Sequence, residues 1–149
     1  STRVRSSAAS DVYKRQGLYH DLGKCAVLMY IDNNARRLLD EEFFCIQSHP
    51  RTGADILNRM GCGRTLALAA LYHHCYYNGK GGYPNDVPSC PPEIKGIVDA
   101  LSVADSLDAA TDNIGRCYNL AKPFRTLLEE LRAQSGTRYA PNVVALFED

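Results

Sequence analysis

Helix start and stop signals follow one another along this chain, and they constrain its fold more than any other feature. Asp40-Glu41-Glu42 places negative charge before an apolar segment at 43–46, as at a helix N-terminus. Pro50 suits the first turn of a second helix, and Gly61-Cys62-Gly63 ends that helix. Strand-like alternation is almost absent. The sequence therefore predicts an all-α protein.

The remaining segments continue the helical pattern. Residues 64–77 are rich in Leu and Ala, and they predict a buried helix that carries His73 and His74 in its C-terminal half. Residues 78–92 contain four Pro and three Gly and predict a loop. A long helix is expected over 93–112. Shorter helices are expected over 123–134 and 141–147.

Composition sets the class of protein. A chain of 149 residues with zero formal net charge and no basic tract is one domain and is unsuited to duplex nucleic acid. No apolar run reaches the roughly 18 residues that span a bilayer. The six cysteines include no CxxC pair, so we expect reduced thiols and a cytoplasmic protein. We expect residues 1–16 to be a non-native-looking or disordered leader before a domain at 17–149.

All four histidines belong to one candidate set of metal ligands. The set is His20, Asp21, His49, His73, His74 and Asp105. Imidazole and carboxylate together suit Mn, Fe, Zn or Ni. Carboxylate-bridged pairs of such metals produce hydroxide for attack on phosphorus. These residue types therefore predict a metal-dependent phosphohydrolase.

Spacing and neighbours support the set, although each member has a plainer interpretation. Adjacent helical residues project about 100° apart, so His20 and Asp21 can reach different sides of a metal cluster. Lys24 adds a cation where a phosphate would lie. Asp105, Asp108 and Asp112 share a helix face and repel each other unless cations lie among them. Taken singly, any of these residues could instead cap a helix or lie at the surface.

Taken together, these residues resemble the HD-GYP family of the HD phosphohydrolase superfamily, from about Leu18 to Phe147. His20-Asp21-Leu22-Gly23-Lys24 resembles its HD-x-GK motif, and Gly82-Tyr83-Pro84 its GYP signature. The other matching segments are His49-Pro50 with 53–57, His73-His74, 103–109, the stretch from Thr111-Asp112 through Arg116 and Tyr118 to Lys122, and 136–141.

The resemblance implies an HD-domain helical bundle that holds two or three divalent ions, Fe or Mn. It implies hydrolysis of cyclic di-GMP to pGpG or GMP by a metal-activated hydroxide, in bacterial signalling. The six residues above would be the metal ligands, with Asp21 bridging. Asp21 and Lys24 would be catalytic, and GGDEF-domain proteins are possible partners. The substrate-binding residues would be Lys24, Gly82, Tyr83, Pro84, Arg116 and Lys122.

The chain departs from the family pattern at two places. Cys75 stands where the family has Glu, and a thiolate there could alter the choice of metal. The family also has a further His on an upstream helix, whereas no histidine precedes His20, so we expect an N-terminally truncated domain with impaired activity. Two alternatives stay open. One is an impaired module that binds cyclic di-GMP or a signalling partner, and the other is an HD phosphohydrolase of another nucleotide.

Overall fold

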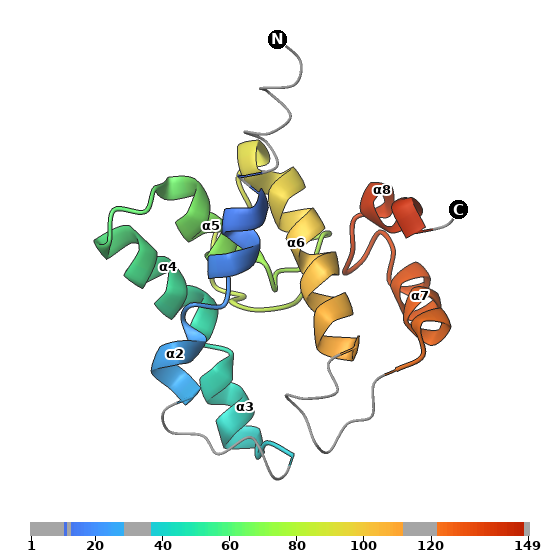
Figure 1. Ribbon diagram of the computed structural model, residues 1–149, viewed down its shortest axis with the longest axis horizontal. Helices are drawn as coiled ribbons and strands as arrows, with labels where there is room; N and C mark the ends of the chain where they lie inside the picture. Colours follow the sequence, from blue (N-terminus) through green and yellow to red (C-terminus); the bar gives the residue numbers. More distant parts are fainter. Residues whose placement is uncertain (1–10, 12, 29–36, 112–121, 148–149) are drawn as a thin grey trace.

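The computed structural model of the chain describes residues 11, 13–28, 37–111 and 122–147. Within these ranges every regular element is helical, which confirms the all-α class (Figure 1). A helical segment at 13–19 precedes the labelled elements. Those elements are α2 Lys24–Val27, α3 Asp40–Ile46, α4 His49–Arg59, α5 Arg64–Tyr72, α6 Pro92–Thr111, α7 Phe124–Ala133, α8 Pro141–Val144 and the 3-10 turn η2 Ala145–Phe147.

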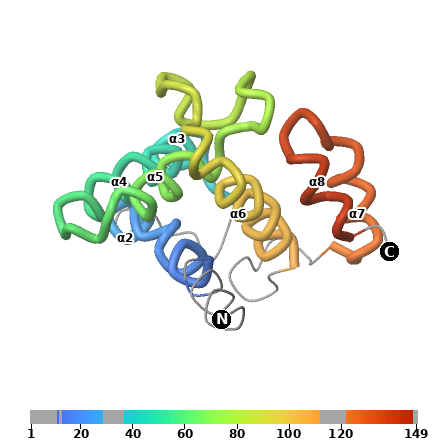
Figure 2. The backbone as a smooth tube through the Cα atoms, turned by 90° about the horizontal axis from the view of Figure 1, so that it is seen from above, coloured from blue at the N-terminus to red at the C-terminus, as the bar shows by residue number. Residues whose placement is uncertain are grey.

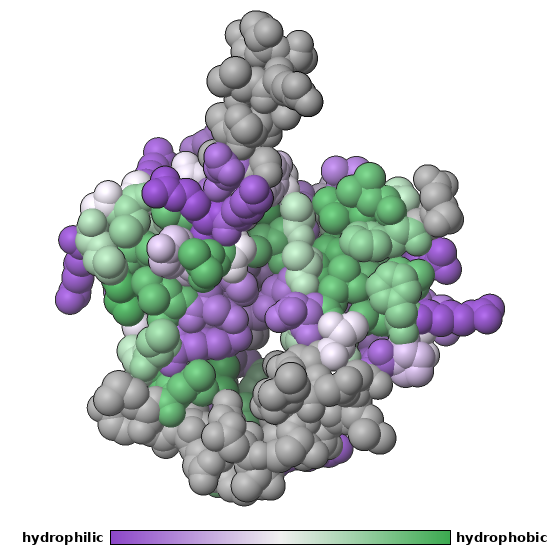
Figure 3. Space-filling model, viewed as in Figure 1, coloured by the Kyte–Doolittle hydropathy of each residue, from purple (hydrophilic) through white to green (hydrophobic). Residues whose placement is uncertain are grey.

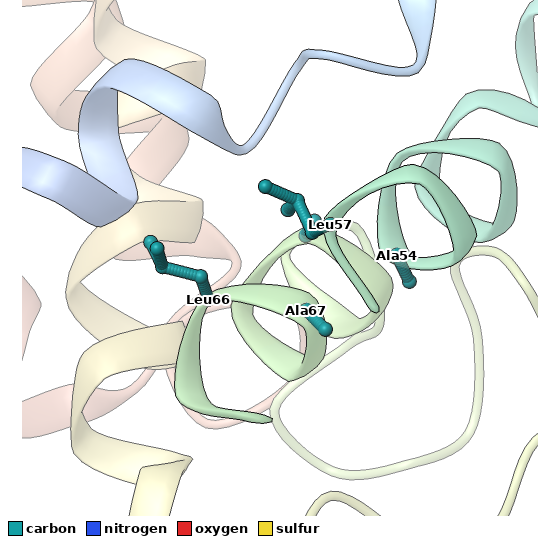
Figure 4. Packing of buried hydrophobic residues seen from close by; sticks show 5 residues of the cluster. Ala54, Leu57, Leu66 and Ala67 are labelled. Carbon is teal, nitrogen blue, oxygen red and sulfur yellow. The ribbon is translucent and has the colours of Figure 1, made fainter. Parts of the chain in front are cut away.

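Helices α4 and α5 form a tightly packed pair. Gly61 and Gly63 both have positive φ, at 66° and 95°, and they allow the chain to reverse between the two helices. Leu57, 1% exposed, packs with Ala54, Leu66 and Ala67 between them (Figure 4). Burial of a leucine of this kind contributes roughly 2 kcal/mol. The small alanines let the two backbones approach closely.

Helix α6 joins the two halves of the molecule. It runs beside α5 on one side and beside α7 and α8 on the other (Figures 1 and 2). Towards α5 it buries Ile94 and Val98 against Tyr72. Towards the C-terminal helices it buries Val103 in a cluster with Leu131, Tyr139 and Val144. A side chain on α6 can therefore take part in a site built from both halves.

Gly23 and Gly53 bring the start of α2 into backbone contact with α4. A Cβ built on Gly23 would lie 2.0 Å from the carbonyl oxygen of His49 and 2.6 Å from the amide nitrogen of Gly53. No larger residue fits at Gly23 without a shift of backbone. This contact places the chain that carries His20 and Asp21 directly beside His49.

The expected helix over 64–77 is too long, because α5 ends at Tyr72. His73 is the C-cap and His74 follows the helix, so the doublet does not lie within a helix as expected. The chain leaves the helix because Tyr76 pairs with a later segment, its N–H donating to the carbonyl of Gly81 at 3.0 Å. Non-local pairing therefore overrides helix propensity at this point.

The other expected helices agree with the structure to within a residue or two. α6 covers the expected segment 93–112 up to Thr111, while Asp112 lies outside the described residues. Residues 13–19 are helical and Gln16 is only 3% exposed, so the last part of the expected leader packs against the fold. The boundary at residue 16 stays a prediction. None of the described helices combines the length and the hydropathy that a membrane crossing needs.

Candidate metal centre

The structure brings all six predicted metal ligands together. They form two groups that share Asp21, and within each group the possible ligand atoms lie within 4.8 Å of one another. The first group is Asp21, His49, His73 and His74, and the second is His20, Asp21 and Asp105. The ligands come from the segment before α2, the start of α4, the end of α5 and the middle of α6. Segments far apart in sequence thus converge on one cluster.

Asp21 directs its two carboxylate oxygens to different groups. Its Oδ1 lies 3.1 Å from His49 Nε2 and 3.7 Å from His73 Nε2. Its Oδ2 lies 3.4 Å from His20 Nε2 and 2.5 Å from Lys24 Nζ. A carboxylate that bridges two cations needs this division of its oxygens. The bridging role itself stays a prediction.

Three of the four imidazoles are oriented in the same way. In each, Nδ1 donates to the backbone carbonyl three residues earlier. The bonds run from His20 to Gly17 at 2.8 Å, from His49 to Ile46 at 2.7 Å, and from His73 to Ala70 at 2.7 Å. A carbonyl only accepts, so Nδ1 carries a proton in each of these rings, and Nε2 is the atom that faces the cluster. Sequence reasoning did not identify these carbonyls, although the repeated spacing offers a signal.

Two buried polar atoms of the cluster have no hydrogen-bond partner. They are Asp21 Oδ1 and His74 Nε2. A buried polar atom without a partner costs roughly 1–3 kcal/mol. His49 Nε2 and His73 Nε2, both with lone pairs, also lie only 3.2 Å apart. Lone pairs that converge without a donor are accounted for by a cation among them, so the residues present fit a metal.

Burial and mutual contact shift the pKa values of the cluster strongly. Burial lowers the pKa of His73, and it lowers the pKa of His74 to about 2. Both rings are therefore neutral, as metal ligands must be. Burial alone would raise the pKa of Asp21, but contacts with His20, His49 and His73 outweigh it and hold that pKa well below its usual range.

His20 and Asp105 form a charged pair at the other end of the cluster. Burial raises the pKa of Asp105, but the contact with His20 outweighs it and brings the pKa down to about 2. Burial lowers the pKa of His20, but contacts with Asp105 and Asp21 prevail and raise it to about 10. A cation bound between His20 and the two carboxylates would take the place of that imidazole proton.

The loop that holds Gly82, Tyr83 and Pro84 folds back onto the histidine doublet. The Tyr83 amide donates to the His74 carbonyl at 3.3 Å, and the two rings lie with centroids 4.4 Å apart. Gly82 has φ 80°, and a Cβ there would lie 2.0 Å from the same carbonyl. Pro84 is buried. These three residues therefore brace His74, and their contact with substrate stays a prediction.

Cys75, which directly follows the histidine doublet, contacts the same loop through its thiol. Its thiol lies 3.5 Å from the Pro84 carbonyl and 3.7 Å from the Tyr83 carbonyl, both of which can accept from it. Burial raises the pKa of Cys75 to about 11, so the thiol keeps its proton. Cys75 also belongs to neither ligand group. An effect of this residue on the choice of metal stays a prediction.

The predicted cations of the site differ in their positions. Lys24 lies beside Asp21 at the cluster, in reach of an anion bound there. Lys122 instead places its Nζ 2.7 and 2.8 Å from the two oxygens of Glu130 on α7. Arg116 lies outside the described residues. Substrate binding by these three residues stays a prediction.

A family model described as the HD domain matches residues 4–110 of the chain. This chain belongs to the HD domain family. The match begins upstream of the expected domain start at residue 17. It includes all six clustered ligands, and it ends at residue 110, one residue before the end of α6. HD domains bind divalent metals, in agreement with the cluster of histidines and aspartates.

Curated relatives of this HD domain are cyclic dinucleotide phosphodiesterases. A "Cyclic di-GMP phosphodiesterase" of Thermotoga maritima is 33% identical over 86% of the chain and 34% of its own length. A "3'3'-cGAMP-specific phosphodiesterase 2" of Vibrio cholerae is 31% identical over 95% of the chain and 26% of its own length. The "Cyclic di-GMP phosphodiesterase response regulator RpfG" of Xanthomonas campestris is 32% identical over 84% of the chain and 32% of its own length. The chain thus spans about a third or less of these relatives, and the expected HD-GYP resemblance is confirmed.

Proposed function

We propose that this HD domain is a metal-dependent phosphodiesterase that hydrolyses cyclic di-GMP to pGpG, GMP or both. The observation that carries the proposal is Asp21, whose two oxygens face two separate groups of ligands. A site built around such a carboxylate suits two cations. The names of the relatives supply the class of substrate.

The residues of the chain divide the work of the site between them. Backbone carbonyls three residues earlier in the chain orient His20, His49 and His73 so that Nε2 of each ring faces the cluster. Divalent cations at such a centre polarise a phosphoryl oxygen and lower the pKa of water. Lys24 adds a positive charge at Asp21, where it can hold the phosphate that reacts. Water then adds across one P–O3′ bond, which opens the ring of the dinucleotide.

Fe or Mn as the resident metals is proposed from the resemblance. Four imidazoles and two carboxylates are compatible with this choice, since such a set suits Mn, Fe, Zn or Ni better than Ca or Mg. The two groups of ligands support two ions rather than one. A GGDEF-domain partner stays a prediction from the resemblance, and a cytoplasmic location stays a prediction from the pattern of cysteines.

A second candidate substrate is 3′3′-cGAMP. The Vibrio cholerae relative with that named specificity is 31% identical to the chain, close to the 33% of the cyclic di-GMP phosphodiesterase. An impaired module that only binds is less well supported. Cys75 lies outside both ligand groups, so the exchange at that position leaves the six ligands in place.

The test is anaerobic incubation of the chain with each dinucleotide and added Mn²⁺ or Fe²⁺, with products separated by chromatography. Asp21→Ala removes the shared carboxylate. Glu129→Ala, which removes an exposed carboxylate on α7 paired with Arg125, is the matched control. Metal-dependent pGpG or GMP that disappears only in Asp21→Ala supports the proposal. A metal-loaded chain that leaves both dinucleotides intact contradicts it.

A further inference from the structure

Arg138 lies beside the loop that follows the histidine doublet, although it belongs to the segment between α7 and α8. Its carbonyl accepts from the Tyr77 amide at 3.0 Å, and the neighbouring Thr137 carbonyl accepts from Asn78 at 3.1 Å. Arg138 belongs to the segment 136–141, which resembles a motif of the HD-GYP family, but no sequence pattern identifies Arg138 itself as functional. The fold carries it from the C-terminal half of the chain to the side of the metal centre.

The guanidinium of Arg138 is held over two aromatic rings. It lies 5.0 Å from the centroid of Tyr139 and 5.9 Å from that of Tyr76. Its Nη2 lies 3.5 Å from Ser106 Oγ, which also accepts from Tyr139 Oη at 3.0 Å. Rings of this kind fix the plane of a guanidinium and leave most of its N–H donors open.

These contacts attach a positive charge to residues that are close in sequence to two predicted metal ligands. Ser106 directly follows Asp105 on α6. Tyr76, under the guanidinium, is two residues beyond His74. Figure 3 shows hydrophilic residues gathered at the centre of this face of the molecule, between α4 and α6. Arg138 therefore lies beside residues that neighbour the ligands Asp105 and His74, whereas Lys24 contacts the ligand Asp21 itself.

The charge of Arg138 has no carboxylate partner among the residues that the structure describes. Other arginines do pair in this way, for example Arg51 with Asp86 and Arg125 with Glu129. Arg138 is partly exposed, so a ligand can reach it. A planar, preoriented guanidinium with open donors matches two oxygens of a phosphate better than a lysine does.

We propose that Arg138 binds the second, non-reacting phosphate of a cyclic dinucleotide. The inference rests on the proposed function, because a cyclic dinucleotide carries two phosphates in one ring. With one phosphate at Lys24 and the cluster, the other lies across the ring and needs a cation of its own. Lys24 contacts Asp21, and Arg138 contacts Ser106, the residue that follows Asp105; the two aspartates each lie 3.4 Å from His20 Nε2. Arg138 is then a positioning residue that selects dinucleotides over single phosphodiesters.

The experiment compares Arg138→Gln and Arg138→Lys with the wild-type chain on three substrates. These are cyclic di-GMP, 3′3′-cGAMP and bis(p-nitrophenyl) phosphate, which has a single phosphodiester. We expect Arg138→Gln to raise KM for both dinucleotides about tenfold, with a smaller change in kcat and in turnover of the small diester. Arg138→Lys should recover part of the loss. The Kd of a slowly hydrolysed phosphorothioate analogue of cyclic di-GMP should rise by the same factor as KM.

Matched controls separate binding from folding. Arg125→Gln removes an exposed arginine on α7 and should leave every parameter at the wild-type value. Metal content and Tm are measured for each variant, since a merely structural role would lower turnover of all three substrates together.

Different outcomes distinguish the inference from the function beneath it. A wild-type chain that neither binds nor cleaves a dinucleotide overturns both. A wild-type chain that cleaves, together with an Arg138→Gln variant of unchanged KM, overturns only the inference. An equal loss of activity on all three substrates would show that Arg138 acts on the fold, and it would also overturn the inference. A loss confined to cyclic di-GMP would indicate recognition of a base and would overturn the assignment to phosphate.

Discussion

The ring of Tyr83 lies over the ring of His74, with centroids 4.4 Å apart and planes inclined by 33°. The same tyrosine donates its amide to the His74 carbonyl at 3.3 Å. His74 Nε2 has no hydrogen-bond partner, and its Nδ1 lies 3.8 Å from Asp105 Oδ2, so none of the described contacts joins this ring to a backbone carbonyl as in the other three imidazoles. The tyrosine ring takes the place of that contact and fixes the plane of this ligand.

Replacement of Tyr83 by leucine should weaken metal binding. Loss of a group that orients a ligand typically costs 10–100-fold in metal affinity, and we expect a loss of about tenfold here. Tyr83→Phe keeps the ring and should bind metal nearly as well as the wild type. Competition with a fluorescent chelator for Mn²⁺ measures both. Equal affinity for the leucine variant and the wild type would contradict the role given to the ring.

The two aspartates should differ in their effect on metal content. Asp21→Asn alters both groups of ligands, whereas Asp105→Asn alters one. We expect the first variant to lose all bound metal and the second to keep part of it, because one group stays complete. Elemental analysis of anaerobically purified protein gives the metal per chain. The idea of a shared carboxylate fails if the two variants retain the same amount.

Gly23→Ala should destabilise the fold. The added Cβ would lie 2.0 Å from a backbone carbonyl that cannot move without shifting α4, and such overpacking costs about 3 kcal/mol. Gly96→Ala is the matched control, because no heavy atom lies within 4 Å of its Cβ on the helix α6. That change should stabilise by about 0.5–1 kcal/mol. Urea unfolding measures both, and a neutral Gly23→Ala would contradict the close contact.

Cys90 should resist alkylation until the pH is high. Burial raises the pKa of Cys90 from its ordinary value to about 11, so the neutral thiol is favoured in the folded protein. The stability that this thiol contributes is present below pH 9 and is lost as the pH rises towards 11. Iodoacetamide labelling from pH 8 to 11, read by mass spectrometry, should modify the exposed Cys62 first. Faster labelling of Cys90 at pH 8 would run against this prediction.

The ligands could be predicted from the sequence because each is a histidine or an aspartate in a distinctive local context. His49 next to Pro50 and Asp105 within an apolar helix are examples. The end of α5 could not be predicted, because it depends on the pairing of Tyr76 with Gly81 and of Cys75 with the Tyr83 carbonyl across the loop. Arg138 was missed for the same reason. Its partner Ser106 lies 32 residues away in the chain, and no local pattern links the two.

The contact between Gly23 and Gly53 has a further consequence for how this domain tolerates change. The chain between these two glycines forms a loop that is closed by their backbone contact. The entropic cost of closing such a loop grows only slowly with the length of the loop. A change in the length of the chain between these two glycines should therefore leave His20, Asp21 and His49 in register. The metal centre would then keep the positions of its ligands while the chain between the two glycines varies in length.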